Sequence, residues 1–221
     1  MLELECSAPA GAATLKEPLM TRRRFEWKLR DRTLVLGERT LIMGVLNVTP
    51  DSFSDGGKYL DPDRAFARAV ELEEEGADII DVGAESTRPG AQRVSEAEEL
   101  RRLAPVLKRL RNQLTVPISV DTYKSGVAEK ALELGALIVN DPSGLTFDAD
   151  LARTAARGNA GLILNHMRGT PETWAKLPPL KDAIGAIAAE LEAKALGELD
   201  YYGAKAPRLQ QLAEFLVARR S

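Results

Sequence analysis

The sequence has almost none of the residues that build disulfide frameworks and zinc sites. Its 221 residues include one cysteine, Cys6, and one histidine, His166. A single thiol cannot form an internal disulfide, and no second histidine or thiol cluster is present to complete a zinc site. No apolar run approaches the ~18 residues of a membrane span, and no apolar signal segment follows Met1. These absences favour a reducing compartment, and we expect the protein in the cytoplasm.

The sequence also has no excess of charge of one sign. It contains 30 lysine and arginine residues and 33 aspartate and glutamate residues, which gives a formal net charge of −3. This balance predicts neither a nucleic-acid partner nor a membrane partner. Apolar residues make up 44% of the chain, which is ordinary for a globular protein with a buried core.

Apolar strand-like segments alternate with helix-like segments along most of the chain. An alternating pattern over Phe25–Leu36 first predicts a β-hairpin with its turn at residues 30–32, placed to plug the bottom of a barrel. Strict β-α alternation then predicts a parallel sheet. The expected strands are residues 41–46, 77–82, 117–120, 136–140 and 161–165, and the expected helices are 61–76, 95–111, 125–134, 149–157 and 182–199.

The expected fold class is α/β, with three segments along the chain. Residues 1–21 form a flexible extension, residues 22–199 the α/β domain, and residues 200–221 a divergent helix that begins near Pro207. A closed (β/α)8 barrel takes eight strands and ~250 residues. About five βα units are visible here, so we expect an incomplete barrel with two open sheet edges, which favours pairing with another chain.

Polar residues end each expected strand, namely Asn47, Asp81, Asp121, Asn140 and Asn165-His166. The carboxyl ends of parallel strands meet at one edge, where α/β proteins build their sites. Carboxylates and amides there suit a flat polar heterocycle. Each residue alone could simply end a strand and start a turn, but five in succession favour a site.

Two loops and two single residues could complete such a site. Arg88, in Thr87-Arg88-Pro89-Gly90, can bind an anion such as phosphate, although a solvated loop arginine is the plainer interpretation. The glycine- and serine-rich loop 49–57 could wrap a pyrophosphate or be a plain connector. Asn47 offers one neutral oxygen to Mg²⁺. His166 is a candidate general base, but a structural histidine is at least as plausible.

Five motifs in this order resemble those of the dihydropteroate synthase family. They are NVTPDSFSDGG (47–57), DVGAESTRPGA (81–91), SVDT (119–122), VND (139–141) and HMRGTP (166–171). The resemblance implies a TIM-type (β/α)8 barrel. It also implies a transferase that joins 4-aminobenzoate to 6-hydroxymethyl-7,8-dihydropterin diphosphate in folate biosynthesis, with Mg²⁺ as the cofactor. A homodimer is expected.

The resemblance also implies residue roles. Asn47 would hold Mg²⁺ with the diphosphate, while Asp121 and Asn140 would bind the pterin ring and Asp81 would support the floor of the site. Thr87 and Arg88 would contact the diphosphate, and Arg88 and Asp121 would be the catalytic residues. Thr49, Pro50 and Phe53 would close over the aminobenzoate.

Three further motifs of the family are missing from this sequence. They are an Asp-Pro-Gly at the end of the next strand, a Ser-Arg-Lys-like segment and an Arg-x-His. The expectation is a chain that lacks the C-terminal third of the family domain. It could be a truncated gene product, an incomplete record of an active enzyme, or a non-catalytic protein that binds a pterin or a partner. A pterin-dependent methyltransferase domain is a further alternative, which the 47–57 motif disfavours.

Overall fold

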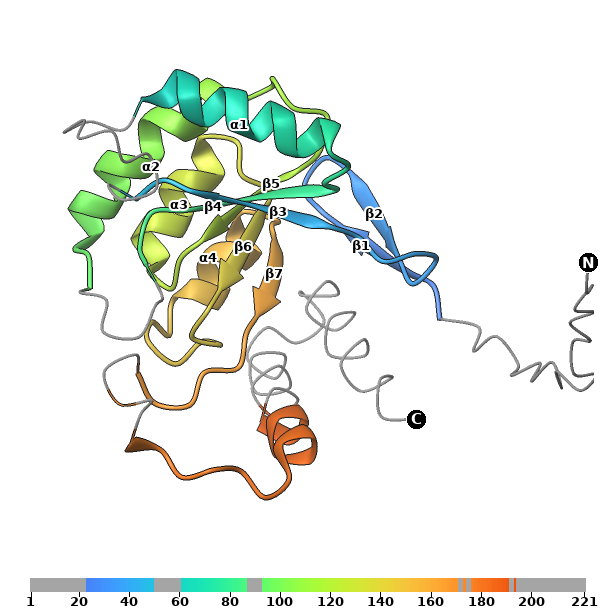
Figure 1. The fold of residues 1–221 in the computed structure, drawn as a ribbon, viewed down its shortest axis with the longest axis vertical. Coiled ribbons are helices and arrows are strands. Elements are labelled where there is room, and N and C mark those ends of the chain that lie inside the picture. The colour runs from blue at the N-terminus through green and yellow to red at the C-terminus, as the bar shows by residue number, and fades with distance from the viewer. Residues whose placement is uncertain are drawn as a thin grey trace, which may run out of the picture.

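The centre of the molecule is a five-stranded parallel sheet (Figure 1). The computed structural model describes residues 23–49, 61–86, 93–170, 173, 176–190 and 193. The strands follow one another in chain order across the sheet. They are β3 (Met43–Asn47), β4 (Ile79–Gly83), β5 (Ile118–Asp121), β6 (Ile138–Asp141) and β7 (Gly161–Leu164). The predicted parallel α/β sheet is therefore confirmed.

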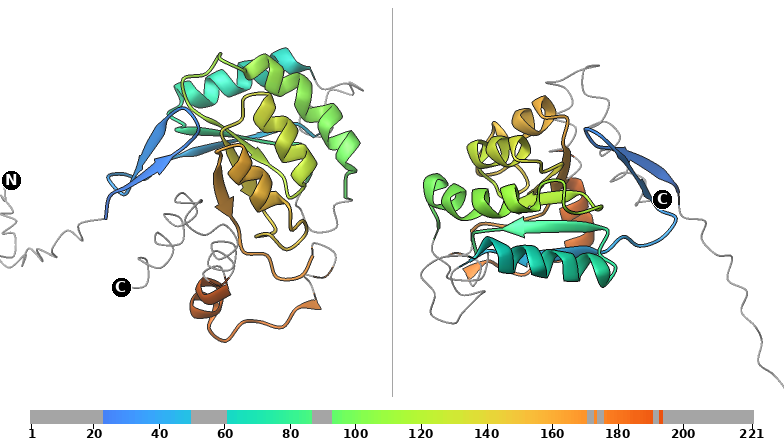
Figure 2. Two further views of the ribbon diagram at one scale, coloured as in Figure 1. Left: turned by 180° about the vertical axis from the view of Figure 1, so that it is seen from behind. Right: turned by 90° about the horizontal axis from the view of Figure 1, so that it is seen from above.

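Four helices connect these strands and lie in one layer along one face of the sheet (Figures 1 and 2). They are α1 (Pro62–Glu74), α2 (Glu96–Leu110), α3 (Ser125–Glu133) and α4 (Leu151–Arg157). Residues 183–190 are also helical and lie apart from this layer, beyond β7 in Figure 1. None of the described helices is long and apolar enough to cross a membrane.

The helix starts follow the capping signals of the sequence. Asp61 caps α1 by accepting a hydrogen bond from the Asp63 N–H at 2.9 Å, and Pro62 takes the first helical position. Ser95 caps α2 by accepting from the Glu98 N–H at 3.3 Å. The Glu98 carboxylate accepts hydrogen bonds from Arg101 and Arg102, which hold its pKa at about 2.

The main hydrophobic core lies between the sheet and the helix layer. Alternate strand residues point into it, including Leu46, Val82, Val120 and Val139, each at most 2% exposed. Because side chains alternate along a strand, the residues between them lie on the opposite face. We call that opposite face the inner face of the sheet.

The hairpin covers the amino-terminal end of the inner face. Strand β1 (Phe25–Lys28) pairs antiparallel with β2 (Thr33–Leu36), so the predicted hairpin and its turn are confirmed. Leu29 on the hairpin packs with Ile79 and Ile138 of the sheet, and Trp27 packs against this second cluster. The Arg30 guanidinium donates to the backbone oxygens of Leu132 (3.1 Å) and Ala136 (3.2 Å). The hairpin therefore forms a floor.

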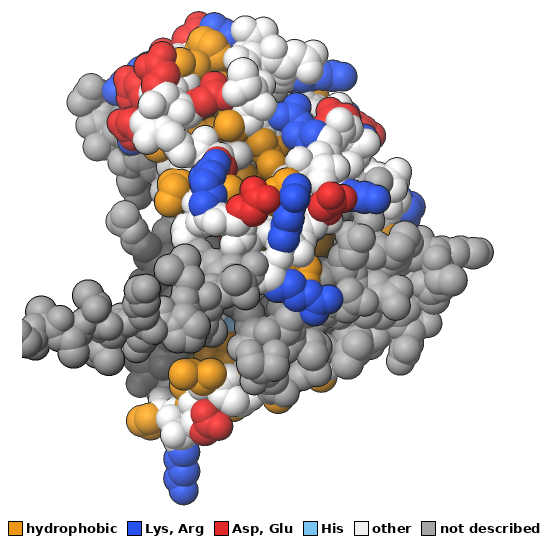
Figure 3. All heavy atoms as spheres, turned by 90° about the vertical axis from the view of Figure 1, so that its right-hand side faces the viewer, with side chains coloured by type: hydrophobic (Ala, Val, Ile, Leu, Met, Phe, Trp, Pro, Cys, Tyr) orange, Lys and Arg blue, Asp and Glu red, His pale blue; other side chains and the backbone are white. Residues whose placement is uncertain are grey.

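Five βα units and a hairpin match the expected incomplete barrel. Within the described residues, β3 and β7 are the edge strands of the sheet. The expected extension (1–21) and the expected C-terminal helix (200–221) lie outside the described residues. On the face seen in Figure 3, the described acidic and basic side chains are interspersed.

Candidate functional site

The carboxyl ends of four strands bring predicted site residues into one row on the inner face. The pairing register joins Asn47 to Gly83, Gly83 to Asp121, and Asp121 to Asn140. Asp81 lies one layer below, next to Ser119 in the register. Strand β4 continues to Gly83, so Asp81 lies inside the strand. Its expected role, support of the floor of the site, stays a prediction.

A chain of hydrogen bonds links the side chains of Asp81, Asn140 and Asn165. The Asn140 Nδ2 donates to Asp81 Oδ2 at 2.9 Å. The Asn165 Nδ2, just beyond β7, donates to Asn140 Oδ1 at 2.8 Å. Each amide or carboxylate in the chain holds its neighbour, which fixes the orientation of Asn140 on the inner face. Asp121 lies beside Asn140, so the pair presents one carboxyl and one fixed amide to a ligand.

The two aspartates of the site are held in an environment that disfavours charge. Burial raises the pKa of Asp81, which is 3% exposed, and the Ser119 hydroxyl and the Asn140 amide only partly offset this effect. Burial also raises the pKa of Asp121, to about 7, and the negative charges of Asp81 and Glu99 add to the shift. Asp121 can therefore take up or release a proton near neutral pH, as residues at functional sites commonly do.

A half-buried lysine links the ends of β4 and β5 beside the aspartates. Lys124 Nζ donates to the carboxylates of Glu85 and Glu99, and the Tyr123 hydroxyl donates to Glu85 Oε1 at 2.8 Å. The side chains of Lys124, Glu85 and Glu99 are 15%, 11% and 1% exposed. Burial would lower the pKa of Lys124, but its hydrogen bonds to the two carboxylates raise it overall. This group fixes the base of the loop that contains Arg88.

Gly83 leaves room for Asp121 in the row of site residues. A methyl group on Gly83 would lie 3.2 Å from Asp121 Oδ2 and 3.3 Å from Asp121 Cβ. Contacts this tight require the aspartate to move. A residue without a side chain at this position therefore allows Asp121 to lie across the end of β4.

Asn47 is the predicted magnesium ligand, and the structure places its side chain exposed at the carboxyl end of β3. The Asn47 side chain lines a cleft of about 500 Å³ along the edge of β3. Arg64 and Arg68 of α1 also line this cleft. Within the described ranges, no group of three or more histidine, cysteine or acidic side chains could hold a metal ion. A neutral amide oxygen is among the ligands that Mg²⁺ accepts, and the role of Asn47 stays a prediction.

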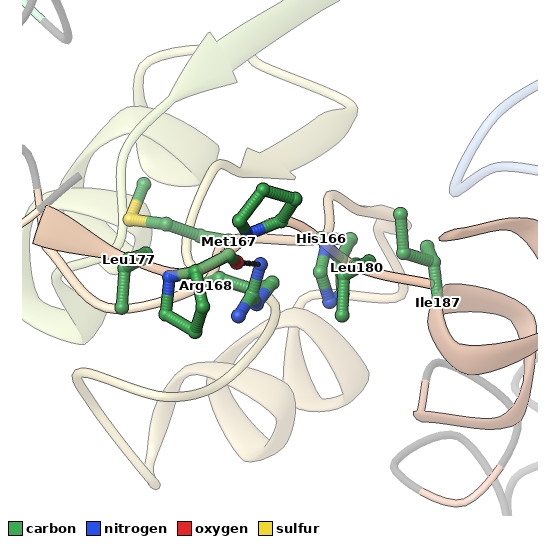
Figure 4. Close-up of a pocket in the computed structure, with 8 residues that line it drawn as sticks. His166, Met167, Arg168, Leu177, Leu180 and Ile187 are labelled. Atoms are coloured by element: carbon green, nitrogen blue, oxygen red, sulfur yellow. Dashed lines mark hydrogen bonds between the residues drawn. The ribbon is translucent and has the colours of Figure 1, made fainter. Parts of the chain in front are cut away.

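His166 has a partner outside the row of site residues. Its Nε2 lies 3.0 Å from Glu190 Oε2, and its side chain is 12% exposed. Figure 4 shows His166 at the wall of a cavity of about 380 Å³, with Leu180 and Ile187 nearby. Arg168 crosses this cavity and donates to the Pro178 backbone oxygen at 2.9 Å. The structure thus gives the histidine a local ion-pair or hydrogen-bond partner.

Several predicted site residues fall outside the described part of the chain. Pro50, Phe53, Thr87 and Arg88 are among them, so their roles stay predictions. Thr49 lies two residues beyond the end of β3 and is half-buried. Sequence reasoning brought Asn47, Asp81, Asp121 and Asn140 to one face, and the structure confirms that placement.

Sequence reasoning missed the buried carboxylates around the site. Glu99 lies in the acidic first turn of α2, a position that normally faces solvent, yet it is 1% exposed. Its signal would have been Lys124, a lysine three residues after the aspartate that ends β5. Such a lysine can neutralise buried acidic groups, but the sequence does not reveal which ones.

The family model described as "Pterin binding enzyme" matches residues 43–203 of the chain. The dihydropteroate synthase of Bacillus subtilis is 55% identical over 131 residues, covering 59% of this chain and 46% of the relative. That of Clostridium beijerinckii is 50% identical over 145 residues, covering 66% and 54%. The chain thus spans about half the length of the curated relatives it matches.

Solved structures give the same result. The dihydropteroate synthase of Yersinia pestis, in a sulfonamide drug complex, aligns with a TM-score of 0.73 at 38% identity, over 82% of this chain and 65% of its own. That of Burkholderia cenocepacia, complexed with 7,8-dihydropteroate, aligns with a TM-score of 0.68 at 35% identity, over 81% and 60%. The residues that the family model matches include all five strands of the sheet, β3 to β7, and the aspartate and asparagine residues of the site. This match shows that the chain belongs to the pterin binding enzyme family.

Proposed function

We propose that this chain carries the pterin site of a dihydropteroate synthase. The observation that carries the proposal is the row of Asp121 and Asn140 above Asp81 at the carboxyl edge of the parallel sheet. A pterin ring has an amino group and ring N–H groups on one edge. An ionised Asp121 can accept from them, and the amide of Asn140 can both donate and accept. A ring with a different pattern would leave these partly buried groups unmatched.

The proposed reaction joins 6-hydroxymethyl-7,8-dihydropterin diphosphate to 4-aminobenzoate. The bond between the pterin methylene carbon and the diphosphate oxygen breaks, and the amino nitrogen of 4-aminobenzoate forms the new bond to that carbon. This nitrogen loses one proton, and the products are 7,8-dihydropteroate and diphosphate. The relatives from Bacillus subtilis and Clostridium beijerinckii carry the name of this enzyme.

In this proposal the residues of the chain bind and orient the substrates. Asp121 and Asn140 hold the pterin ring on the inner face, and the hairpin floor keeps the ring near the carboxyl edge. Thr87 and Arg88 would bind the diphosphate, while Thr49, Pro50 and Phe53 would cover the 4-aminobenzoate. Holding two rings in a fixed geometry lowers the barrier without a strong base. His166 has no part in the reaction.

Asn47 would hold a magnesium ion together with the diphosphate. When bound, the ion would neutralise charge that develops on the leaving diphosphate. The single amide oxygen of Asn47 fits an ion that keeps most of its water and phosphate ligands. We further propose that the chain forms a homodimer in the cytoplasm. The single cysteine favours a reducing compartment, and the open sheet edges favour pairing with a second chain.

The test is a pair of measurements on the purified chain. Calorimetry should detect pterin binding, and Asp121→Asn should weaken it by roughly 1–3 kcal/mol because one ring N–H loses its ionic acceptor. Release of diphosphate from the pterin diphosphate, with Mg²⁺ present, should then require 4-aminobenzoate. Binding without turnover would reduce the proposal to a pterin-binding protein. A folded chain without pterin binding would contradict it.

Arg88→Ala tests the role assigned to the loop at 87–90. It should weaken binding of the pterin diphosphate far more than binding of the bare pterin, because only the former carries the anion that a guanidinium binds. Equal losses for the two ligands would remove Arg88 from the diphosphate site. Calorimetry with both ligands provides the comparison.

A further inference from the structure

We propose that Asn165 is a positioning residue that selects which arrangement of hydrogen-bond donors and acceptors the site accepts. It does so by holding the amide of Asn140 in one of its two possible orientations. This inference rests on the proposed pterin site. The resemblance assigns no role to Asn165, and its side chain is exposed at the mouth of the inner face.

Acceptor-only groups stand at both ends of the hydrogen-bond chain. At one end, the Asp81 carboxylate accepts from Asn140 Nδ2 at 2.9 Å. At the other end, the backbone oxygen of Asp141 accepts from Asn165 Nδ2 at 3.4 Å, and the same nitrogen donates to Asn140 Oδ1 at 2.8 Å. A backbone carbonyl can only accept, and so can the Asp81 side chain when it is ionised. Rotating either amide by 180° would therefore place an oxygen against an oxygen.

The fixed orientation determines what Asn140 offers to a ligand. One of its two N–H groups is used by Asp81, and one acceptor position on Oδ1 is used by Asn165. One N–H and one acceptor position remain. They stand beside Asp121 in the register. A heterocycle must match this order of donor and acceptor, because an amide that cannot rotate cannot adapt to the opposite order.

Removing the Asn165 amide should release this constraint. Asn140 would then be held by its bond to Asp81 alone. With one bond in place of two, the amide could give up that bond and turn toward whichever ligand group is present. The site should then lose affinity for the preferred ring. It should also discriminate less against a ring with a reversed edge.

The experiment compares two ligands that differ at position 2 and at the neighbouring ring nitrogen N1, which changes from an acceptor to a donor. Pterin carries a 2-amino group, which donates, whereas its 2,4-dioxo analogue lumazine carries an oxygen there, which accepts. Calorimetry would measure both affinities for the wild-type chain and for Asn165→Leu and Asn165→Ala, which keep and remove the side-chain volume. Gln113→Leu, which removes an exposed amide in the turn after α2, is the matched control.

We expect the Asn165 variants to bind pterin about tenfold more weakly, as the loss of one hydrogen bond predicts. The ratio of their affinities for pterin and lumazine should fall at least severalfold. Gln113→Leu should leave both the pterin affinity and this ratio unchanged. An unchanged preference, with or without an equal loss of affinity for both ligands, would overturn the inference. If the folded wild-type chain binds no pterin, the proposed function fails and this inference fails with it.

Discussion

The carboxyl group of Asp121 titrates near neutral pH, because burial and four neighbouring carboxylates raise its pKa to about 7. An ordinary aspartate has a value of 3.8. Between these two values the folded chain binds more protons than the unfolded chain. Stability therefore falls as pH rises from about 4 to about 7. In the proposed site a pterin needs the charged form of Asp121, and this is the form in which the folded chain is less stable.

Asp121→Asn should reverse this effect. The neutral amide removes the repulsion from Asp81 and Glu99, so the variant should melt at a higher temperature than the wild type at pH 8. The difference should shrink toward pH 4, where the wild-type carboxyl is protonated. Thermal unfolding followed by circular dichroism at several pH values provides the measurement. A variant that melts lower at pH 8 would show that the charged carboxylate is stabilised by its surroundings.

Single residues were predicted well where one strand determines their position. Asn47 and Asp121 each end a strand and Asn140 is the last residue but one of β6, and parallel strands bring such ends together. The contacts that orient them were not predicted. Asn165 reaches Asn140 because β7 lies beside β6 and Asn165 is the first residue after β7. The sequence does not show the register of these two strands.

The hairpin is the element that closes one end of the inner face, and Gly161 in β7 makes its docking possible. A methyl group on Gly161 would lie 2.5 Å from Trp27 Cζ2 and 2.7 Å from Leu29 Cδ2. Gly161→Ala should therefore displace the hairpin and lower the free energy of unfolding by about 1–3 kcal/mol. Urea denaturation measures the loss.

Gly126→Ala is the matched control for this change. The added methyl group in α3 would meet only the end of the exposed Glu96 side chain, which can move aside. Alanine also favours a helix more than glycine does, so stability should stay the same or rise. Equal losses in the two variants would mean that the hairpin is not tightly docked.

The connection between β4, β5 and α2 depends on Lys124. Lys124→Met would leave the buried carboxylates of Glu99 and Glu85 without their ammonium partner, which should cost about 3–5 kcal/mol. Lys130→Met removes a lysine from an exposed pair, with Glu133 at 2.6 Å, and should cost less than about 1 kcal/mol. Urea denaturation of both variants tests the contrast, and similar losses would contradict it.

The elements themselves followed from local signals. Asp61 and Pro62 start α1 as predicted, and the turn of the hairpin lies at residues 30–32. Four expected strands began one or two residues early, at Leu41, Ala77, Pro117 and Ala136, because apolar residues precede the first paired position. The burial of Glu99 could not be predicted, because it depends on how α2 packs over the end of β5.

The chain as a whole has an exposed sheet edge among its described residues. Ile42 is 53% exposed and Val45 is 57% exposed, and Val45 lies in the edge strand β3. Exposed edges with apolar side chains favour pairing between chains. We therefore expect a concentration-dependent mass in light scattering, and Val45→Lys should shift the chain toward the monomer.

Ile184→Lys is the control for that measurement. Ile184 is 86% exposed but lies in the helical residues 183–190, outside the sheet. Its substitution should leave the mass unchanged. A wild-type chain that stays monomeric at all concentrations would show that the edge of β3 does not mediate association.

The hairpin also sets an order of events during synthesis. It is made before every strand of the sheet, and its own two strands can pair at once. Its docking partners come much later, because Arg30 binds backbone oxygens 102 and 106 positions further along and Trp27 packs against Gly161. The strands between are added one after another, each beside the last. The hairpin is therefore made before the sheet but is among the last described elements to reach its final place, because its apolar side stays uncovered until β6 and β7 have been made.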